Sequence, residues 1–306
     1  MIRCSILLLF FLPTLASAET QIFIQVLGIA QDAGYPQAFC YQAHCNRSWE
    51  DPTLRRLTSS IAVVNKTSKN KYLFDATPDI REQLYQLNKA APDGEFTLGG
   101  VFLTHAHIGH YTGLMHFGHE ASGSSNVPVY AMPRMVEFLS TNGPWDQLVR
   151  YQNIQLMPLN DGTFVTFDKK LRVTPFLVPH RDEYSETVGF RIEGPEKTAV
   201  FIPDIDKWER WDTDIREIVR TSDYVLIDAT FFANGELAGR DMSKIPHPFV
   251  SESMALLDDL TDEEKSRVIF IHMNHTNPLL IDGSDAQAEV ERRGFSYARE
   301  GLRLAL

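Results

Sequence analysis

Short runs of apolar and β-branched residues recur along the whole chain, separated by polar segments that contain Gly or Pro. Such runs predict β-strands, here at residues 21–27, 60–64, 72–74, 101–103, 127–130, 171–178, 187–192, 199–202, 224–227 and 268–271. Between several of them, amphipathic segments predict helices at 78–88, 110–120, 133–139, 212–220, 251–260 and 286–293. Because strands and helices are mixed throughout, we expect an α/β or α+β layered fold.

Side chains that can bind a metal stand at or just after the ends of four of these apolar strands. They are Asp75, His180, Asp204 and His272. A single residue of this kind is compatible with a solvated strand end. Four of them, together with the histidine-rich segment described next, indicate one face of a sheet at which metal ligands gather.

The segment from Thr104 to His110 brings together three of the ten histidines of the chain, directly after the apolar run 101–103. Because side chains alternate along a strand, His105 and His107 are expected to leave the strand end on the same side. His110 falls where the chain turns into the next predicted helix. Imidazole is the commonest protein ligand for zinc and also suits iron, nickel and copper. A surface cluster of histidines is the alternative, but the spacing favours a metal site.

The first 18 residues have the pattern of a secretory signal peptide. Arg3 precedes the apolar run 6–15, and small residues follow at 16–18. We therefore expect cleavage near Ala18 and a secreted or periplasmic protein whose single domain comprises residues 19–306. No later stretch approaches the roughly 20 apolar residues of a membrane helix, so we expect no stable membrane insertion.

Charge and cysteine content narrow the class of protein further. The sequence has 29 Lys and Arg against 40 Asp and Glu, a formal net charge of -11, which argues against nucleic acid as a partner. Two cysteines, Cys40 and Cys45, would remain after signal cleavage. Export to an oxidising space is compatible with a short-loop disulfide, and the intervening His44 with a small zinc site that lacks an identified fourth ligand. A disulfide or free thiols are favoured over the zinc site.

In the order of its candidate ligands the chain resembles the metallo-β-lactamase fold superfamily. The matching positions are Asp75, the segment His105–His110, His180, Asp204 and His272. The resemblance implies a four-layer αβ/βα sandwich of two mixed sheets with outer helices. The segments 26–37, 59–62, 75–80, 239–240 and 272–278, with His247, are similar to the pyrroloquinoline quinone biosynthesis protein B group. That group is also similar to a bacterial phosphonate-pathway cyclic phosphodiesterase.

The resemblance implies a first metal position with three imidazoles and one carboxylate, namely His105, His107, His180 and Asp204. Asp204 would complete this position or bridge it to a second, which His110 and His272 would face. Three imidazoles with an open position are typical of catalytic zinc, so one or two zinc ions are expected, with iron or manganese as alternatives. Asp75 is expected to accept a hydrogen bond from a ligating imidazole.

Gly109 departs from the superfamily pattern. The superfamily loop reads His-x-His-x-Asp-His, and Gly109 stands where the Asp would bind the second metal. The biosynthesis group, in contrast, usually lacks the two leading histidines and keeps the Asp-His pair. We therefore expect the second position to be short of a carboxylate and weaker than the first, with His275 as a candidate replacement ligand.

Three further residues have two interpretations each. His247, between Pro246 and Pro248, is a candidate to protonate a leaving group or bind an anionic substrate, or is a loop histidine held by the prolines. Asp206 either shares the face of Asp204 or caps the helix that follows. Asp228 ends a predicted strand and either orients a ligand or is structural.

These observations favour an exported metal-dependent hydrolase that uses metal-bound hydroxide on a small phosphodiester or ester. Asp204 and His247 are its candidate catalytic residues, and its partner is a small-molecule substrate. An iron-dependent oxidation is one alternative, because two histidines and a carboxylate with open positions also suit non-haem iron. Carriage of the quinone or its precursor is the other. The sequence leaves the substrate and the oligomeric state open.

Overall fold

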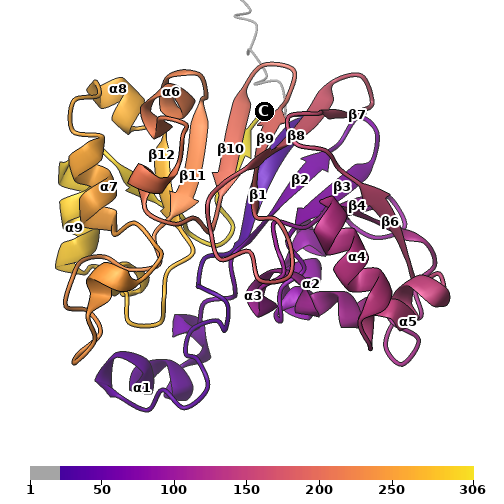
Figure 1. Ribbon diagram of the computed structural model, residues 1–306, viewed down its shortest axis with the longest axis horizontal. Coiled ribbons are helices and arrows are strands. Elements are labelled where there is room, and N and C mark those ends of the chain that lie inside the picture. Colours follow the sequence, from indigo (N-terminus) through magenta and orange to yellow (C-terminus); the bar gives the residue numbers. More distant parts are fainter. Residues whose placement is uncertain (1–20) are drawn as a thin grey trace, which may run out of the picture.

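The computed structural model describes residues 21–306 and shows two seven-stranded sheets packed face to face, with helices on their outer sides (Figure 1). This arrangement confirms the expected αβ/βα sandwich. The expected signal peptide, with its cleavage near Ala18, lies outside the described residues. Within residues 21–306, no helix is both long enough and apolar enough to cross a membrane.

The first sheet has the strand order β14-β1-β2-β3-β4-β5-β6. Its strands are β1 (Ile22–Gly28), β2 (Ser60–Asn65), β3 (Asn70–Phe74), β4 (Thr97–Phe102), β5 (Val127–Ala131), β6 (Ile154–Pro158) and β14 (Arg303–Ala305). Strands β3 to β6 are parallel to one another. The helices on its outer side are α2 (Ile80–Ala90), α4 (Pro133–Thr141) and α5 (Trp145–Arg150).

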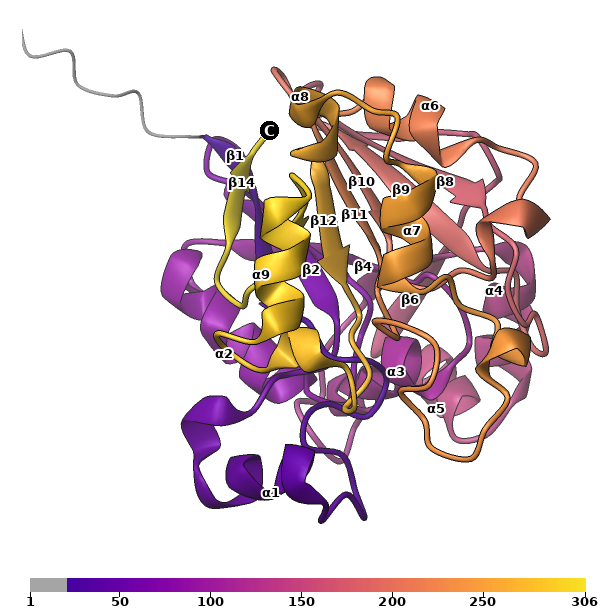
Figure 2. The same cartoon turned by 90° about the vertical axis from the view of Figure 1, so that its left-hand side faces the viewer.

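The second sheet has the order β13-β12-β11-β10-β9-β8-β7. Its strands are β7 (Val165–Phe167), β8 (Leu171–Leu177), β9 (Val188–Glu193), β10 (Thr198–Ile202), β11 (Tyr224–Asp228), β12 (Val268–Ile271) and β13 (Ser296–Tyr297). The accompanying helices are α6 (Ile215–Arg220), α7 (Val250–Leu256), α8 (Asp262–Lys265) and α9 (Asp285–Arg292). Figure 2 shows α7 and α9 in front of β11 and β12. Helix α1 (Ala43–Glu50) lies apart from both sheets, below them in Figure 1.

The core is built by strands that are buried on both faces. Along β1, Ile22 and Ile24 pack into the layer between the sheets, whereas Phe23 packs with the outer helices of the first sheet. This division follows from the alternation of side chains along a strand. Between the sheets, the rings of Phe74 and Phe102 stack with centroids 4.8 Å apart. Phe190 of the other sheet meets Phe74 edge-on at 5.4 Å, so aromatic contacts join the two sheets.

The helix expected at 110–120 is the main correction to the predicted elements. The structure has a short α3 (Ile108–Tyr111) and then a 3₁₀ helix (Thr112–Phe117). The backbone N–H of Gly113 donates to the carbonyl of Ala76, 2.9 Å away, outside the helix. A Cβ at Gly113 would lie 2.1 Å from the carbonyl oxygen of Thr77, so this close packing requires glycine. Helices α1, α5 and α8 and strands β6, β7, β13 and β14 were not predicted.

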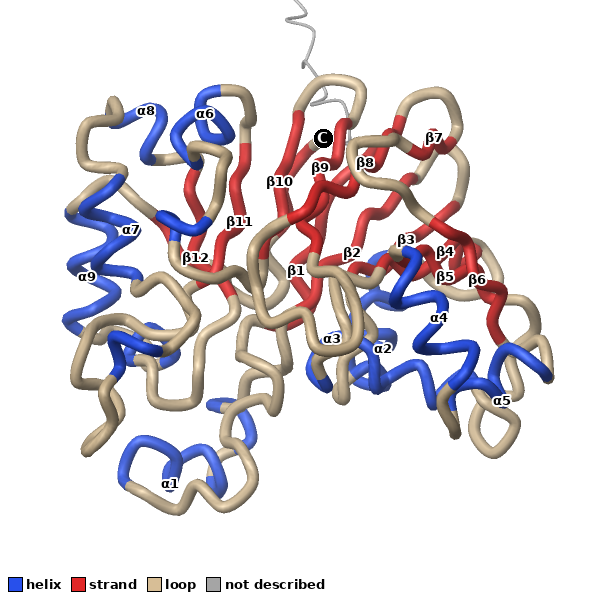
Figure 3. Tube along the Cα trace, in the orientation of Figure 1, coloured by secondary structure: helices blue, strands red, loops and turns tan. Residues whose placement is uncertain are grey.

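Candidate ligands gather because several strands end at the same edge of the sandwich. In the first sheet, β3 and β4 are parallel. In the second, β10, β11 and β12 are parallel, and β8 has the same direction as β10 because both are antiparallel to β9. Figure 3 shows the loops that follow these strands gathered between the two groups of helices. Loops at the carboxyl ends of parallel strands are where α/β proteins place their sites.

Candidate metal centre

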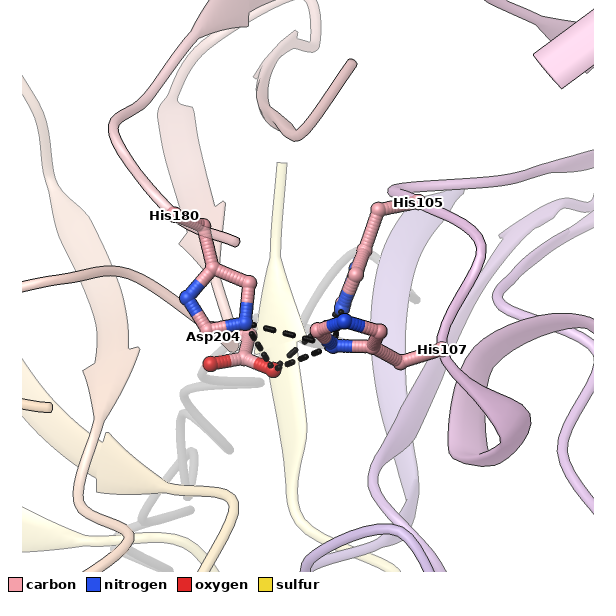
Figure 4. A group of neighbouring side chains, drawn as sticks. All are labelled: His105, His107, His180 and Asp204. Atoms are coloured by element: carbon pink, nitrogen blue, oxygen red, sulfur yellow. Dashed lines mark hydrogen bonds and ion pairs between the residues drawn. The ribbon is translucent and has the colours of Figure 1, made fainter. Parts of the chain in front are cut away.

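Four of the expected ligands converge on one point, as Figure 4 shows. His105 and His107 lie in the loop after β4, His180 follows β8 and Asp204 follows β10. Oδ2 of Asp204 lies 3.3 Å from Nε2 of His105 and 3.3 Å from Nε2 of His180. Nδ1 of His107 lies 2.9 Å from Nε2 of His105 and 3.2 Å from Nε2 of His180. Two nitrogens bound to one tetrahedral zinc at 2.0–2.1 Å are about 3.3 Å apart, so the group has the size of a zinc site.

Electrostatics act differently on the members of this group. Burial alone would lower the pKa of His107, but Asp204 and Glu183 raise it above its usual value. Burial and the neighbouring His110 lower the pKa of His105 well below its usual range, so its ring is neutral, as a metal ligand must be. Burial alone would raise the pKa of Asp204. His180 and His247 outweigh that effect and hold it well below its usual range. Asp204 is therefore an ionised carboxylate with almost no exposure to solvent, 3% of its surface.

A second group lies beside the first and shares Asp204 with it. His110, in α3, and His272, after β12, are fully buried. Nε2 of His110 lies 3.8 Å from Oδ2 of Asp204. Between the two rings stands Asp32, whose Oδ1 lies 3.2 Å from Nε2 of His110 and 3.7 Å from Nε2 of His272. The structure thus corrects the expectation that the second position lacks a carboxylate.

Sequence reasoning missed Asp32 because the residue is far from the histidine loop along the chain. It lies in the loop after β1, so it repeats the pattern of a ligand-capable side chain beyond a strand end that marked the other positions. His275, the expected replacement, lies elsewhere. Its ring faces His44, with centroids 5.6 Å apart, and its Nδ1 lies 3.0 Å from Oδ1 of Asn274.

The polar atoms that face the second position fit a bound cation. Nε2 of His110, Nε2 of His272 and Oδ1 of Asp32 are buried, and none has a well-aligned hydrogen-bond partner among residues 21–306. Leaving buried polar groups unpaired costs roughly 1–3 kcal/mol each. A metal ion would satisfy all three atoms at once, so the donors present match the group that the family resemblance implied.

Asp75 orients His110, as expected from its place at the end of β3. Its Oδ2 accepts a hydrogen bond of 2.8 Å from Nδ1 of His110, which leaves Nε2 of the ring directed at the second position. Its Oδ1 accepts from the backbone N–H of Thr104 at 2.8 Å. Asp75 and His272 both have positive φ, 66° and 68°, a region that costs non-glycine residues energy and is concentrated at functional sites.

His247 lies beside the centre and is held by two carboxylates. Its Nδ1 lies 2.8 Å from Oδ2 of Asp228 and 3.2 Å from Oδ1 of Asp204. Burial by itself would lower the pKa of His247, but Asp228 and Asp204 raise it to about 10. Asp228 is fixed in turn by the backbone N–H of Thr230 at 2.7 Å. Asp228 therefore positions His247, and the imidazole is protonated at neutral pH.

Three peripheral features complete the comparison with the expected residues. Glu183, three residues after His180, lies with Oε2 3.0 Å from Nε2 of His107. Asp206 pairs with Arg210 at 2.8 Å, away from the metal groups. Cys40 and Cys45 form a disulfide, which answers the alternatives left open for them.

A cavity of about 720 Å³ opens beside the second position. Its wall includes Gln31, which precedes Asp32, and Asn274, which lies two residues after His272. Phe231, also in the wall, has its ring 6.2 Å from that of His247. The cavity is therefore lined by residues close in sequence to Asp32 and His272 and by Phe231, which packs near His247.

Comparison with known proteins identifies the class to which this fold and site belong. A family model described as "Beta-lactamase superfamily domain" matches residues 70–273, and the chain belongs to that superfamily. It is 28% identical over 309 residues to the coenzyme PQQ synthesis protein B of Methylorubrum extorquens (strain PA1), with 92% of this chain and 99% of that protein covered. The protein of the same name from Cupriavidus necator is 26% identical, with the same coverage.

Solved structures agree with this assignment. The Zn(2+)-bound PqqB from Methylobacterium extorquens has a TM-score of 0.76 at 25% sequence identity, covering 93% of this chain and 100% of that one. A diphosphatase from the PhnP family shares the fold, with a TM-score of 0.63 at 22% identity over 92% of this chain and 96% of that one. The resemblance to the quinone-biosynthesis group is confirmed. Together with the His and Asp groups, it supports a metal cofactor at this centre.

Proposed function

We propose that this chain is an exported metal-dependent hydrolase that acts on a small phosphodiester or ester. The observation that carries the proposal is the convergence of His105, His107, His180 and Asp204 beside a protonated His247. Catalytic zinc has three protein ligands and an open position, and the three imidazoles supply such a set beside Asp204. Zinc is therefore the proposed metal, and His110 and His272 would face a second ion. When bound, zinc acts as a Lewis acid and lowers the pKa of its water from about 15.7 to about 7.

The residues around the centre have separate tasks in this proposal. The substrate would enter the cavity that is lined by Gln31 and Phe231, with its reacting group towards the metal centre. His247 would donate a proton to the leaving group from Nε2, which has no hydrogen bond within the described part of the chain. Asp228 accepts from Nδ1 and keeps the ring in that orientation. Both carboxylates that hold His247 also keep it protonated at the pH at which a proton donor is needed.

Hydrolysis of bis(p-nitrophenyl) phosphate and p-nitrophenyl acetate tests the proposal. Turnover should disappear after chelation, return in proportion to added zinc, and be indifferent to oxygen and reductants. Turnover that needs iron and oxygen would contradict it. A complete lack of metal-dependent turnover on phosphodiesters, esters and lactams would refute it as well.

A second function is favoured by a different observation, the 28% identity to coenzyme PQQ synthesis protein B over 92% of this chain. In this alternative the protein oxidises a quinone precursor with iron, or carries the quinone or its precursor without turnover. Anaerobic and aerobic assays of the iron-loaded protein separate oxidation from hydrolysis. Tight binding of the quinone by protein that turns over none of these substrates would favour carriage.

The site of action is part of the proposal, because the first 18 residues have the pattern of an export signal. Fractionation of cells that produce the full chain should place the protein in the periplasm or the medium. Amino-terminal sequencing should then begin near Glu19. A protein that stays in the cytoplasm with an intact amino terminus would show that this part is wrong.

A further inference from the structure

We infer that Asp32 supplies the carboxylate of the second metal position, in place of the side chain that the histidine loop lacks at Gly109. The inference deepens the proposed function and rests on it, since both require that the centre binds metal. The metal ligand then comes from the loop after β1. The order of residues in the histidine loop gives no indication of it.

The carboxylate of Asp32 is divided between two tasks. Oδ2 accepts a hydrogen bond of 3.0 Å from Nε2 of Gln31, which fixes the plane of the group. Oδ1 is buried, has no well-aligned hydrogen bond to any described residue, and points at Nε2 of His110 and Nε2 of His272. A neighbour therefore holds one oxygen of Asp32, while the other oxygen points at two unpaired imidazole nitrogens. This arrangement is the one expected of a metal ligand.

The backbone ties Asp32 to the segment that carries His272. The N–H of Gln31 donates to the carbonyl of Met273 at 2.8 Å, and the N–H of Met273 donates to the carbonyl of Ile29 at 2.8 Å. These two bonds lock the residues before Asp32 against the residue after His272. The relative position of the two candidate ligands is therefore set by main-chain contacts, which stiffen a site more than side-chain contacts alone.

Gly109 provides the space that Asp32 occupies. A Cβ at position 109 would lie 2.4 Å from Cα and 2.4 Å from Oδ1 of Asp32, far inside van der Waals contact. Position 109 therefore cannot carry any side chain while Asp32 stays in place. The loop after β1 therefore fills the space that the Asp of the superfamily loop would need, and Asp32 is the carboxylate that faces the second position.

Charge explains why a carboxylate is needed there. His110 and His272 contribute no charge when they bind a metal as neutral rings, and Asp204 is shared with the first position. Without Asp32, two dications a few ångströms apart would be balanced by a single carboxylate. With Asp32, the second ion has its own counter-charge, so we expect two ions per chain.

Zinc titration of the whole mature protein tests the inference, with metal content read by mass spectrometry and affinity by competition with a chromophoric chelator. Wild type should bind two zinc ions. Asp32→Asn, which keeps the shape of the side chain, should keep one ion and weaken the second by more than about 100-fold. Asp79→Asn is the matched control, because Asp79 accepts from Thr58 near the same loop and belongs to neither metal group.

The exclusion between positions 32 and 109 makes a sharper prediction. Gly109→Asp should weaken the second ion, because its side chain collides with Asp32. Gly109→Ala, whose Cβ meets Cα and Oδ1 of Asp32 without adding a carboxylate, should weaken the second ion as well. Circular dichroism and unfolding midpoints would identify any variant that fails to fold.

Outcomes separate this inference from the proposed function. Wild type that binds a single ion, or Asp32→Asn that binds two as tightly as wild type, would overturn the inference and leave the first position intact. Gly109→Ala that binds the second ion as tightly as wild type would overturn the exclusion between the two positions. Wild type that binds no zinc would instead remove the basis of the proposed function itself.

Discussion

The substitution Asp75→Asn should weaken metal binding at the second position and leave metal binding at the first position unchanged. In the structure, Oδ2 of Asp75 accepts from Nδ1 of His110, which requires the ring tautomer with its proton on Nδ1. Nε2 is then free to bind a metal. In Asp75→Asn, the amide oxygen can keep the bonds from Thr104, and the NH₂ group would face Nδ1 of His110. The ring must then accept at Nδ1, so its proton moves to Nε2 and points at the metal position.

The size of the effect follows from the role of such orienting carboxylates. Their loss typically lowers metal affinity 10- to 100-fold, or about 1.4–2.7 kcal/mol. Asp75→Asn should therefore weaken the second zinc by this factor and leave the first unchanged, as measured by competition titration. Asp79→Asn is the matched control, since Asp79 likewise accepts from a Thr backbone N–H and a Thr hydroxyl, those of Thr58, and belongs to neither metal group. It should leave both metal affinities as they are. Equal weakening of both ions in Asp75→Asn, or no weakening of either, would refute the reasoning.

Three more predictions concern the first position and His247. His107→Ala should remove the first ion, so that metal content falls by one zinc per chain; wild-type content would contradict the assignment. His247→Ala should slow substrates with poor leaving groups by 10²- to 10⁴-fold while affecting activated esters little, and equal losses would make His247 a binding residue. In metal-free protein, the pKa of His247 is raised to about 10, so its contribution to stability is complete below pH 6.5 and is lost as pH rises through 10. Denaturant midpoints should fall across that range in wild type and stay flatter in His247→Gln; identical slopes would refute the pairing.

Much of the architecture was readable from local pattern. The apolar runs that predicted strands at 60–64, 199–202 and 268–271 correspond to β2, β10 and β12, because strands buried on both faces must be apolar along their whole length. The helix at 110–120 failed, since its backbone is drawn into bonds with a neighbouring loop. Local spacing carries no signal for such a contact.

The candidate site divides in the same way. The spacing of His105 and His107, and the position of His180 and Asp204 after apolar strands, indicated ligands at one edge, because parallel strands bring their carboxyl ends there. The family resemblance then implied that these four residues form the first group. The orienting role of Asp75 followed from the same argument. These residues could be found because each one repeats a local pattern that the chain itself displays.

Asp32 required the tertiary structure. Gly109 appeared to be a missing ligand when only the histidine loop was considered, yet the absence of a side chain there is what admits Asp32 from the loop after β1. The two loops are far apart along the chain. Their packing against each other depends on main-chain contacts such as those between Gln31 and Met273. The sequence alone therefore determined which metal-binding side chains gather at one edge of the sandwich, because the alternation of residues along each strand shows where the strand ends. Only the packing of the loops decided which carboxylate completes the second position. That choice depends on the room left beside Gly109 in the folded protein, which the intervals between residues along the chain do not reveal.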